Sequence, residues 1–202
     1  MRGEIASTAR IGMGAAPLAA VALLAVVVGA GRPAAAHDGP IETTPAEERD
    51  LWVSLGARVH GGFGSLIAVG IRIGDDARRR LGAAPRELDV TYRSSLAAPC
   101  PCIVDGVMIA TRASPGQGTL RVADAPAGPG LFGHVVIRHR PSGRAVAYAV
   151  PEAIWPRLRD INKEPTGVGR WDAVMAIPTA ELMTVQDIPA ADASGPATEA
   201  KP

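Results

Sequence analysis

The sequence has few of the residues that usually build metal clusters and large hydrophobic cores. It contains two cysteines, Cys100 and Cys102, so it cannot supply the four thiolates of an iron–sulfur cluster. Aromatic residues make up 3% of the chain, which leaves Val, Ile, Leu and Ala to form the core. The net charge is +1 and the arginines are dispersed, without the basic stripe that phosphate binding requires. We therefore expect no iron–sulfur cluster and no nucleic-acid partner.

Common catalytic motifs are also missing. The stretch His60-Gly61-Gly62 is not accompanied by a Gly-x-Ser-x-Gly nucleophile elbow, which argues against an esterase. The glycines lack the spacing of a dinucleotide-binding or P-loop motif, and no predicted strand precedes them. No complete catalytic constellation is recognised, so the sequence does not establish an enzyme.

An export signal is predicted at the N-terminus. Arg2 and Arg10 precede an apolar run over residues 15–31, shorter than the roughly 20 apolar residues of a membrane-spanning helix, and alanines follow it. We expect residues 1–36 to be a secretory signal peptide cleaved after Ala36, with an uncleaved anchor as the alternative. The product would be periplasmic or secreted, without a stable membrane span.

The rest of the chain is predicted to be a single α+β domain, with helices packed on a mixed, largely antiparallel sheet. Its expected parts are a flexible leader over residues 37–46, the folded domain over 47–188 and a disordered tail over 189–202.

Hydrophobic periodicity predicts the individual elements. Two histidines of a predicted hairpin, His134 and His139, are expected to be structural. An apolar segment over residues 172–185 is expected to close the core. The expected elements are helices over 45–59, 66–81 and 103–111 and from Pro151, strands over 87–93 and 119–122, and a hairpin of 133–140 and 144–150.

A glycine-rich turn links the first two predicted helices. Gly61, Gly62 and Gly64 allow unusual backbone turns and leave N–H groups exposed before Ser65, where a ligand or anion can bind. The alternative is a plain helix-to-helix turn with Ser65 as a cap.

Both cysteines lie immediately before the helix predicted over residues 103–111. A helix N-terminus stabilises a thiolate, the form of cysteine that binds metals and attacks electrophiles. A Cys-Pro-Cys disulfide closes a very small ring, so we expect a metal site or a reactive thiol pair instead of a structural bridge. Two simpler roles remain open, since Cys102 can be a buried hydrophobic residue and Asp105 can cap its helix.

The order of these motifs resembles the FmdE-like family of formylmethanofuran dehydrogenase proteins. The resemblance covers roughly residues 50–185 and rests on three segments. In that family a His-Gly-x-x-Gly turn opens a helix, and a Cys-x-x-Asp-Gly stretch leads to a cysteine-containing glycine loop. It implies an α+β domain associated with a bound transition metal such as zinc. The segments are His60 to Ala77, Cys102 to Thr111, and Gly116 to Leu120.

The resemblance places the family's motif residues on His60, Cys102 and Asp105. The family's second cysteine falls on Ala113, so one thiolate is missing, while Cys100 is additional. Either Cys100 substitutes for that ligand, or the site is altered or empty.

We therefore expect an exported metal-binding protein, either a metal carrier or a site for a small C1-type ligand. His60, Cys102 and Cys100 are the expected ligands, and Asp105 either binds the metal or orients His60. Sulfur and imidazole donors favour zinc, copper or nickel, with zinc expected first. The alternatives are a thiol redox protein that uses Cys100 and Cys102, and a metal-free module binding a ligand or partner at the glycine-rich turn. The oligomeric state stays open.

Overall fold

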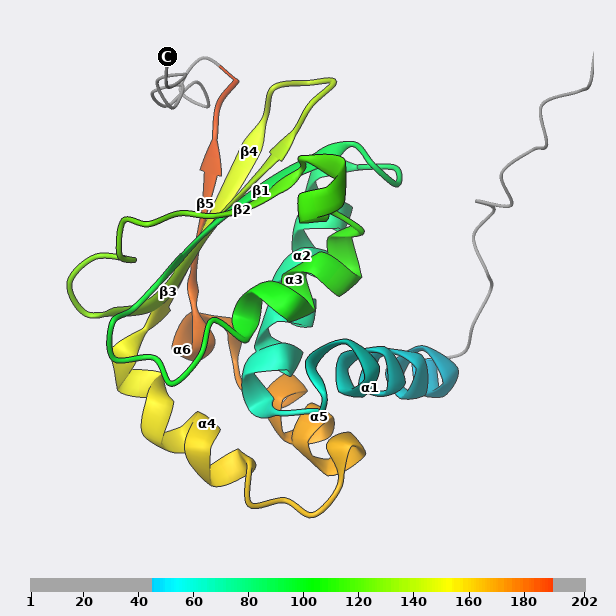
Figure 1. Cartoon of the computed structure of the whole chain (residues 1–202), viewed down its shortest axis with the longest axis vertical. Helices are drawn as coiled ribbons and strands as arrows, with labels where there is room; N and C mark the ends of the chain where they lie inside the picture. The colour runs from blue at the N-terminus through cyan, green and yellow to red at the C-terminus, as the bar shows by residue number, and fades with distance from the viewer. Residues whose placement is uncertain (1–44, 191–202) are drawn as a thin grey trace, which may run out of the picture. The chain divides into compact units, whose positions relative to one another are not determined.

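The computed structural model describes residues 45–190, which form six α-helices and one five-stranded mixed sheet (Figure 1). This α+β architecture confirms the predicted fold class. The helices are α1 (Pro45–His60), α2 (Ser65–Leu81), α3 (Ile103–Thr111), α4 (Trp155–Ile161), α5 (Gly167–Met175) and α6 (Thr179–Leu182). The strands are β1 (Leu88–Ser94), β2 (Leu120–Val122), β3 (Leu131–His139), β4 (Ala145–Pro151) and β5 (Thr184–Ile188).

Strand order in the sheet is β2-β1-β3-β4-β5. β1 and β2 run parallel, with Val90 opposite Leu120, and all other neighbours are antiparallel. The turn of the β3–β4 hairpin contains Gly143 at φ 71°, a left-handed conformation that glycine adopts without steric cost. The expected hairpin is thus the centre of the sheet.

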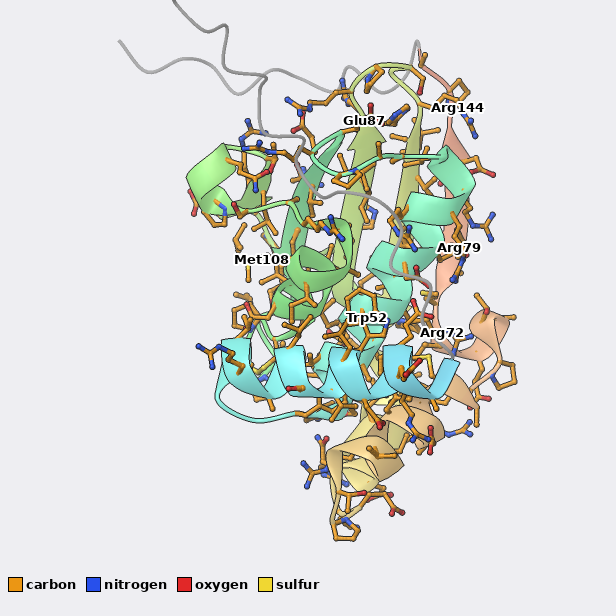
Figure 2. The ribbon with its side chains drawn as sticks, turned by 90° about the vertical axis from the view of Figure 1, so that its right-hand side faces the viewer. Trp52, Arg72, Arg79, Glu87, Met108 and Arg144 are labelled. Atoms are coloured by element: carbon orange, nitrogen blue, oxygen red, sulfur yellow. A yellow bond between two sulfur atoms is a disulfide. The ribbon has the colours of Figure 1, made fainter. Side chains whose placement is uncertain are left out.

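Helices α2 and α3 lie beside one another on the same face of the sheet (Figure 2), and a buried hydroxyl joins α2 to strand β4. Tyr148 of β4 donates its hydroxyl hydrogen to Asp76 of α2 at 2.8 Å. Burial raises the pKa of Tyr148, so the phenol stays protonated and remains a donor. Gly82, at φ 61°, ends α2 as a C-terminal cap.

Helices α2 and α3 meet at two glycines without side chains between their backbones. A Cβ added to Gly70 would overlap the carbonyl oxygen of Ile103, and one added to Gly106 would overlap that of Ile67. This backbone contact fixes the N-terminal end of α3 against the first half of α2.

The last helices are attached to α2 by the half-buried Arg72. Arg72 donates to the carbonyl oxygens of Val174 and Ile177, at 3.1 and 2.7 Å, and to the hydroxyl of Thr179. Burial lowers the pKa of Arg72, and its three acceptors compensate for the lost hydration. Figure 2 shows Arg72 near Trp52 of α1, which packs against the core.

The predicted elements agree with the structure except near the C-terminus. The apolar segment over 172–185 divides into the end of α5, helix α6 and the first residues of β5. Strand β5 was not predicted, because its alternation is weak and its exposed face carries Thr184 and Gln186. Val185 of β5 packs against the core, so this segment does help to close it.

The predicted signal peptide, the flexible leader up to residue 44 and most of the predicted tail lie outside the described residues. Among residues 45–190, no helix is both long enough and apolar enough to cross a membrane.

Candidate metal centre

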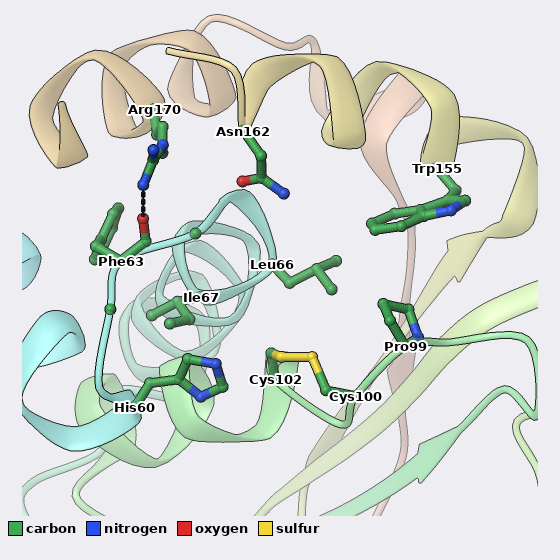
Figure 3. Close-up of a pocket in the computed structure, with 12 residues that line it drawn as sticks. His60, Phe63, Leu66, Ile67, Pro99, Cys100, Cys102, Trp155, Asn162 and Arg170 are labelled. Carbon is green, nitrogen blue, oxygen red and sulfur yellow. Dashed lines mark hydrogen bonds between the residues drawn. A yellow bond between two sulfur atoms is a disulfide. The ribbon is translucent and has the colours of Figure 1, made fainter. Parts of the chain in front are cut away.

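Three side chains from two distant segments meet at one end of the α2–α3 contact. His60 is the last residue of α1, while Cys102 is the N-cap of α3 and Cys100 lies two residues earlier. A ring nitrogen of His60 and the two Sγ atoms all lie within 4.8 Å of one another. His60 and Cys102 are therefore as close as a shared metal site requires. Figure 3 shows the His60 ring facing the two sulfur atoms.

Asp105 holds the His60 ring from the first turn of α3. Its Oδ2 lies 2.7 Å from Nδ1 of His60, and both side chains are about one-third exposed, at 33% and 32% for His60 and Asp105. With Nδ1–H donated to the carboxylate, the lone pair of the neutral ring is on Nε2. Asp105 is thus placed to orient His60, and the three-residue donor group does not include it.

The two cysteines are joined by a disulfide in this structure. We expected the small ring to disfavour this bond. The chain is bent at Pro101, because the two Cα atoms lie 5.3 Å apart, whereas an extended chain would hold them at about 7 Å. The distance of 5.3 Å is within the range found in disulfides.

The disulfide and His60 form part of the wall of an open pocket of about 310 Å³. Leu66, Ile67, Pro99 and Trp155 supply apolar surface, and Trp155 stacks on Phe132 with ring centroids 5.0 Å apart. The remaining lining residues are Gly62, Phe63, Gly64, Asn162 and Arg170.

The predicted glycine-rich binding turn contributes to this pocket through Gly62 and Gly64. Ser65 instead joins α2 to α4, because its amide donates to Asn162 Oδ1 and its hydroxyl donates to the Leu158 carbonyl, both at 2.8 Å. Ser65 makes no side-chain cap to its own helix. A Cβ added to Gly62 would meet no atom within 4 Å, so neither packing nor a left-handed φ requires glycine there.

Ala113, the position of the family's second cysteine, follows the far end of α3. The nine residues of α3 have a rise of about 14 Å, so a side chain at Ala113 and one at Cys102 cannot bind the same ion. Ala113 is buried in the core. A cysteine at this position would therefore not join the donor group of His60, Cys100 and Cys102, and Cys100 does not occupy its place.

Sequence reasoning missed the pocket residues contributed by α4 and α5. Asn162 and Arg170 follow His60 by about a hundred positions and belong to no recognisable motif. Only the tertiary contact of α4 and α5 with the start of α2 brings them to the site. Of the expected structural histidines, His139 contacts Ser142 and Glu87 through its two ring nitrogens. For His134, burial and the nearby Arg93 lower the pKa, so its ring favours the neutral form.

Comparisons with known proteins identify the family. The profile described as FmdE, molybdenum formylmethanofuran dehydrogenase operon, matches residues 59–175. A structural match is the crystal structure of a tungsten formylmethanofuran dehydrogenase FmdE-like protein from Syntrophus aciditrophicus. The two chains are 18% identical, with a TM-score of 0.48 and coverage of 70% of this chain and 72% of that chain. No curated protein matches. Because the profile spans more than half of the sequence, including His60, both cysteines and Asp105, the chain belongs to the FmdE family.

Proposed function

We propose that this protein is an exported FmdE-family protein that binds one transition-metal ion through His60, Cys100 and Cys102. The observation that carries the proposal is the grouping of three donor atoms within 4.8 Å at the wall of a pocket. Zinc is the expected metal, because two thiolates and an imidazole form a donor set that zinc prefers.

The donor spacing suits a tetrahedral ion once the disulfide is reduced. Bonds of about 2.0 to 2.3 Å place neighbouring ligand atoms roughly 3.3 to 3.8 Å apart, so small side-chain movements suffice. Three protein ligands leave the fourth position for water or a small molecule, as in reactive zinc sites and unlike closed structural ones. Such a site suits a metal carrier or a centre that meets a small C1-type ligand in the pocket.

Asp105 and the N-terminus of α3 would prepare two of the ligands for the metal. Asp105 accepts the Nδ1 hydrogen of His60, which fixes the tautomer and leaves Nε2 as the ligand atom. The N-terminus of α3 favours the thiolate of Cys102. A bound zinc ion would supply Lewis acidity at the open position.

The disulfide supports a second candidate, a thiol redox protein. Reduction of a bound partner's disulfide by Cys100 and Cys102 would end with these two residues oxidised to the bridge seen here. The two proposals differ in one respect, since metal binding requires both thiolates and the bridged form has neither.

Metal analysis under two redox conditions tests the metal proposal. Protein from the exported fraction is reduced with a phosphine, equilibrated with zinc and desalted without oxygen, and a second sample is treated in the same way without reductant. We expect about one zinc per chain in the reduced sample and almost none in the bridged sample. Equal zinc in both samples would place the metal away from the cysteines. Absence of zinc, copper and nickel from the reduced sample would leave the redox candidate.

The export proposal has its own test. N-terminal sequencing of the abundant form is expected to start at His37. A form that starts at Met1 would contradict cleavage.

A further inference from the structure

The pocket has a polar end that the metal proposal does not use. Asn162 follows α4, and Arg170 lies in the first two turns of α5. Both line the pocket together with His60 and the cysteines, and Figure 3 shows them on the side opposite the disulfide.

Asn162 has a fixed amide orientation. Its Oδ1 accepts the Ser65 N–H at 2.8 Å, which determines that the NH₂ group occupies the other position of the amide. That NH₂ group makes no hydrogen bond to any residue between 45 and 190. The two N–H donors of the Asn162 amide are therefore held at the pocket, where a ligand could accept from them.

Arg170 is also held in place, and the two groups that hold its guanidinium are backbone carbonyls. Its Nε donates to the Glu164 carbonyl at 2.9 Å and its Nη1 to the Phe63 carbonyl at 2.8 Å. Both acceptors are neutral, so no carboxylate neutralises the guanidinium through these bonds. Nη2 has no hydrogen-bond partner within the described part of the chain.

The surroundings of this end favour a negative charge. Among residues 45–190, no Asp or Glu lines the pocket. Gly64, the N-cap of α2, also lines the pocket and has no side chain to cap the helix, so the positive end of this 17-residue helix lies at the pocket. An anion here would meet Asn162, Arg170 and the helix N-terminus at once.

The rest of the pocket is apolar and small. Leu66, Ile67, Pro99 and Trp155 form its walls, and stacking on Phe132 holds the Trp155 ring. A volume of about 310 Å³ is at the lower end of the range for small-molecule sites. A ligand that fits therefore combines a compact apolar body with one anionic group.

We propose that this pocket binds a small organic carboxylate, with its carboxylate at Asn162 and Arg170 and its apolar body against Leu66 and Trp155. The inference rests on the proposed function, because it names the ligand class of the pocket that adjoins the metal centre. The carboxylate end is separate from His60 and the cysteines, so binding there does not need the metal.

Isothermal titration with three probes tests the inference on the chain from residue 37. The probes are 3-phenylpropionate, its neutral analogue 3-phenylpropan-1-ol, and acetate, which lacks the apolar body. Each is titrated into zinc-loaded reduced protein and into metal-free bridged protein, with zinc content measured separately. We expect 3-phenylpropionate to bind both forms, and the alcohol and acetate to bind at least about tenfold more weakly.

Asn162→Asp is the decisive variant. The new carboxylate still accepts the Ser65 N–H at the start of α2, where a negative charge is favourable, so the fold should be retained. It replaces the NH₂ donors with a repelling charge. We expect at least a tenfold weaker affinity for 3-phenylpropionate, unchanged affinity for the alcohol and unchanged zinc content. The matched control is Asp160→Asn, an exposed change on α4.

The outcomes separate this inference from the metal proposal. Equal binding of acid and alcohol, no binding of the acid at millimolar concentration, or unchanged acid affinity in Asn162→Asp would each overturn the inference, whatever the zinc content. Selective acid binding by a protein that takes up no metal would support the inference and overturn the metal proposal. If Asn162→Asp fails to fold, the comparison of acid with alcohol in the unmodified protein still decides.

Discussion

His60 and His139 each contact a carboxylate, but they differ in what lies at the second ring nitrogen. His139 uses both nitrogens within the fold, Nδ1 with the Ser142 hydroxyl at 2.8 Å and Nε2 with Glu87 at 3.1 Å. His60 uses Nδ1 with Asp105, and Figure 3 shows its ring facing the two sulfur atoms. His139 therefore has no lone pair to offer an ion, whereas His60 has one that is oriented and accessible.

The comparison shows how His60, the proposed metal ligand, differs from a histidine whose ring is used within the fold. A carboxylate partner alone does not, since both residues have one. The side chain of His139 is also less exposed, at 12% against 33% for His60. The distinguishing feature is a second nitrogen directed at other potential ligands.

The largest effect is expected from removing donors of the metal centre. His60→Ala and Cys102→Ser should each abolish most zinc binding by the reduced protein, because the two remaining donors hold an ion poorly. His139→Ala, the matched control, should leave the zinc content unchanged although it removes a histidine with a carboxylate partner. Zinc per chain after equilibration and desalting measures all three. Full zinc retention in the His60→Ala, Cys102→Ser double variant would place the metal elsewhere.

Cys100→Ser should follow, with two separate readouts. If Cys100 is the third ligand, zinc affinity in the reduced protein should fall by at least a hundredfold, and disulfide formation should disappear. A loss of the disulfide with unchanged zinc affinity would make Cys100 a redox partner only. Competition with a chromophoric chelator gives the affinity, and thiol counting after mild oxidation gives the disulfide.

The sequence predicted most elements of the fold because their signals are local. Helix α2 has a strong apolar periodicity and a glycine cap at Gly82, and the β3–β4 hairpin has alternating strands around Gly143. Strand β5 has neither feature and, among the strands that the structure describes, pairs with β4 alone, so its formation depends on the completed sheet.

The site was only partly predictable, because some of its residues are brought together by tertiary contacts and not by a local motif. His60, Cys102 and Asp105 belong to motifs that could be read along the chain. The distance between Ala113 and the metal centre could not be read, because it depends on the length and direction of α3. Asn162 reaches the pocket only through its bond to Ser65, which joins residues 97 positions apart.

Asp105→Asn tests the orienting contact and should have an intermediate effect. The amide can still accept from His60 Nδ1, but a neutral acceptor holds the ring less firmly and raises its basicity less. We expect zinc affinity to fall by about 10- to 100-fold with no loss of thermal stability. Asp160→Asn is the control, since that carboxylate pairs with Lys163 on the surface. An affinity loss as large as that of His60→Ala would indicate that Asp105 binds the metal itself.

The smallest effect is expected at the other histidine, as a change in acid stability. The pKa of Glu87 is lowered by the hydrogen bond from the Ala84 amide and, secondarily, by His139. A carboxyl group whose pKa is lower in the folded state stabilises the protein above its unfolded pKa, and this contribution is lost as the pH falls through the folded pKa. The unmodified protein should therefore lose thermal stability on acidification below about pH 5 more steeply than Glu87→Gln, whose amide oxygen can still accept from Ala84.

Thermal melts at half-unit pH steps measure this slope, and the melting temperatures of the two proteins should change in parallel above pH 6. Because Glu87 is solvent-exposed, the difference should be small, and it should shrink further in 0.5 M salt. Identical slopes at low salt would mean that folding does not lower the pKa of Glu87. The zinc content should be the same in both proteins at every pH at which the fold is intact.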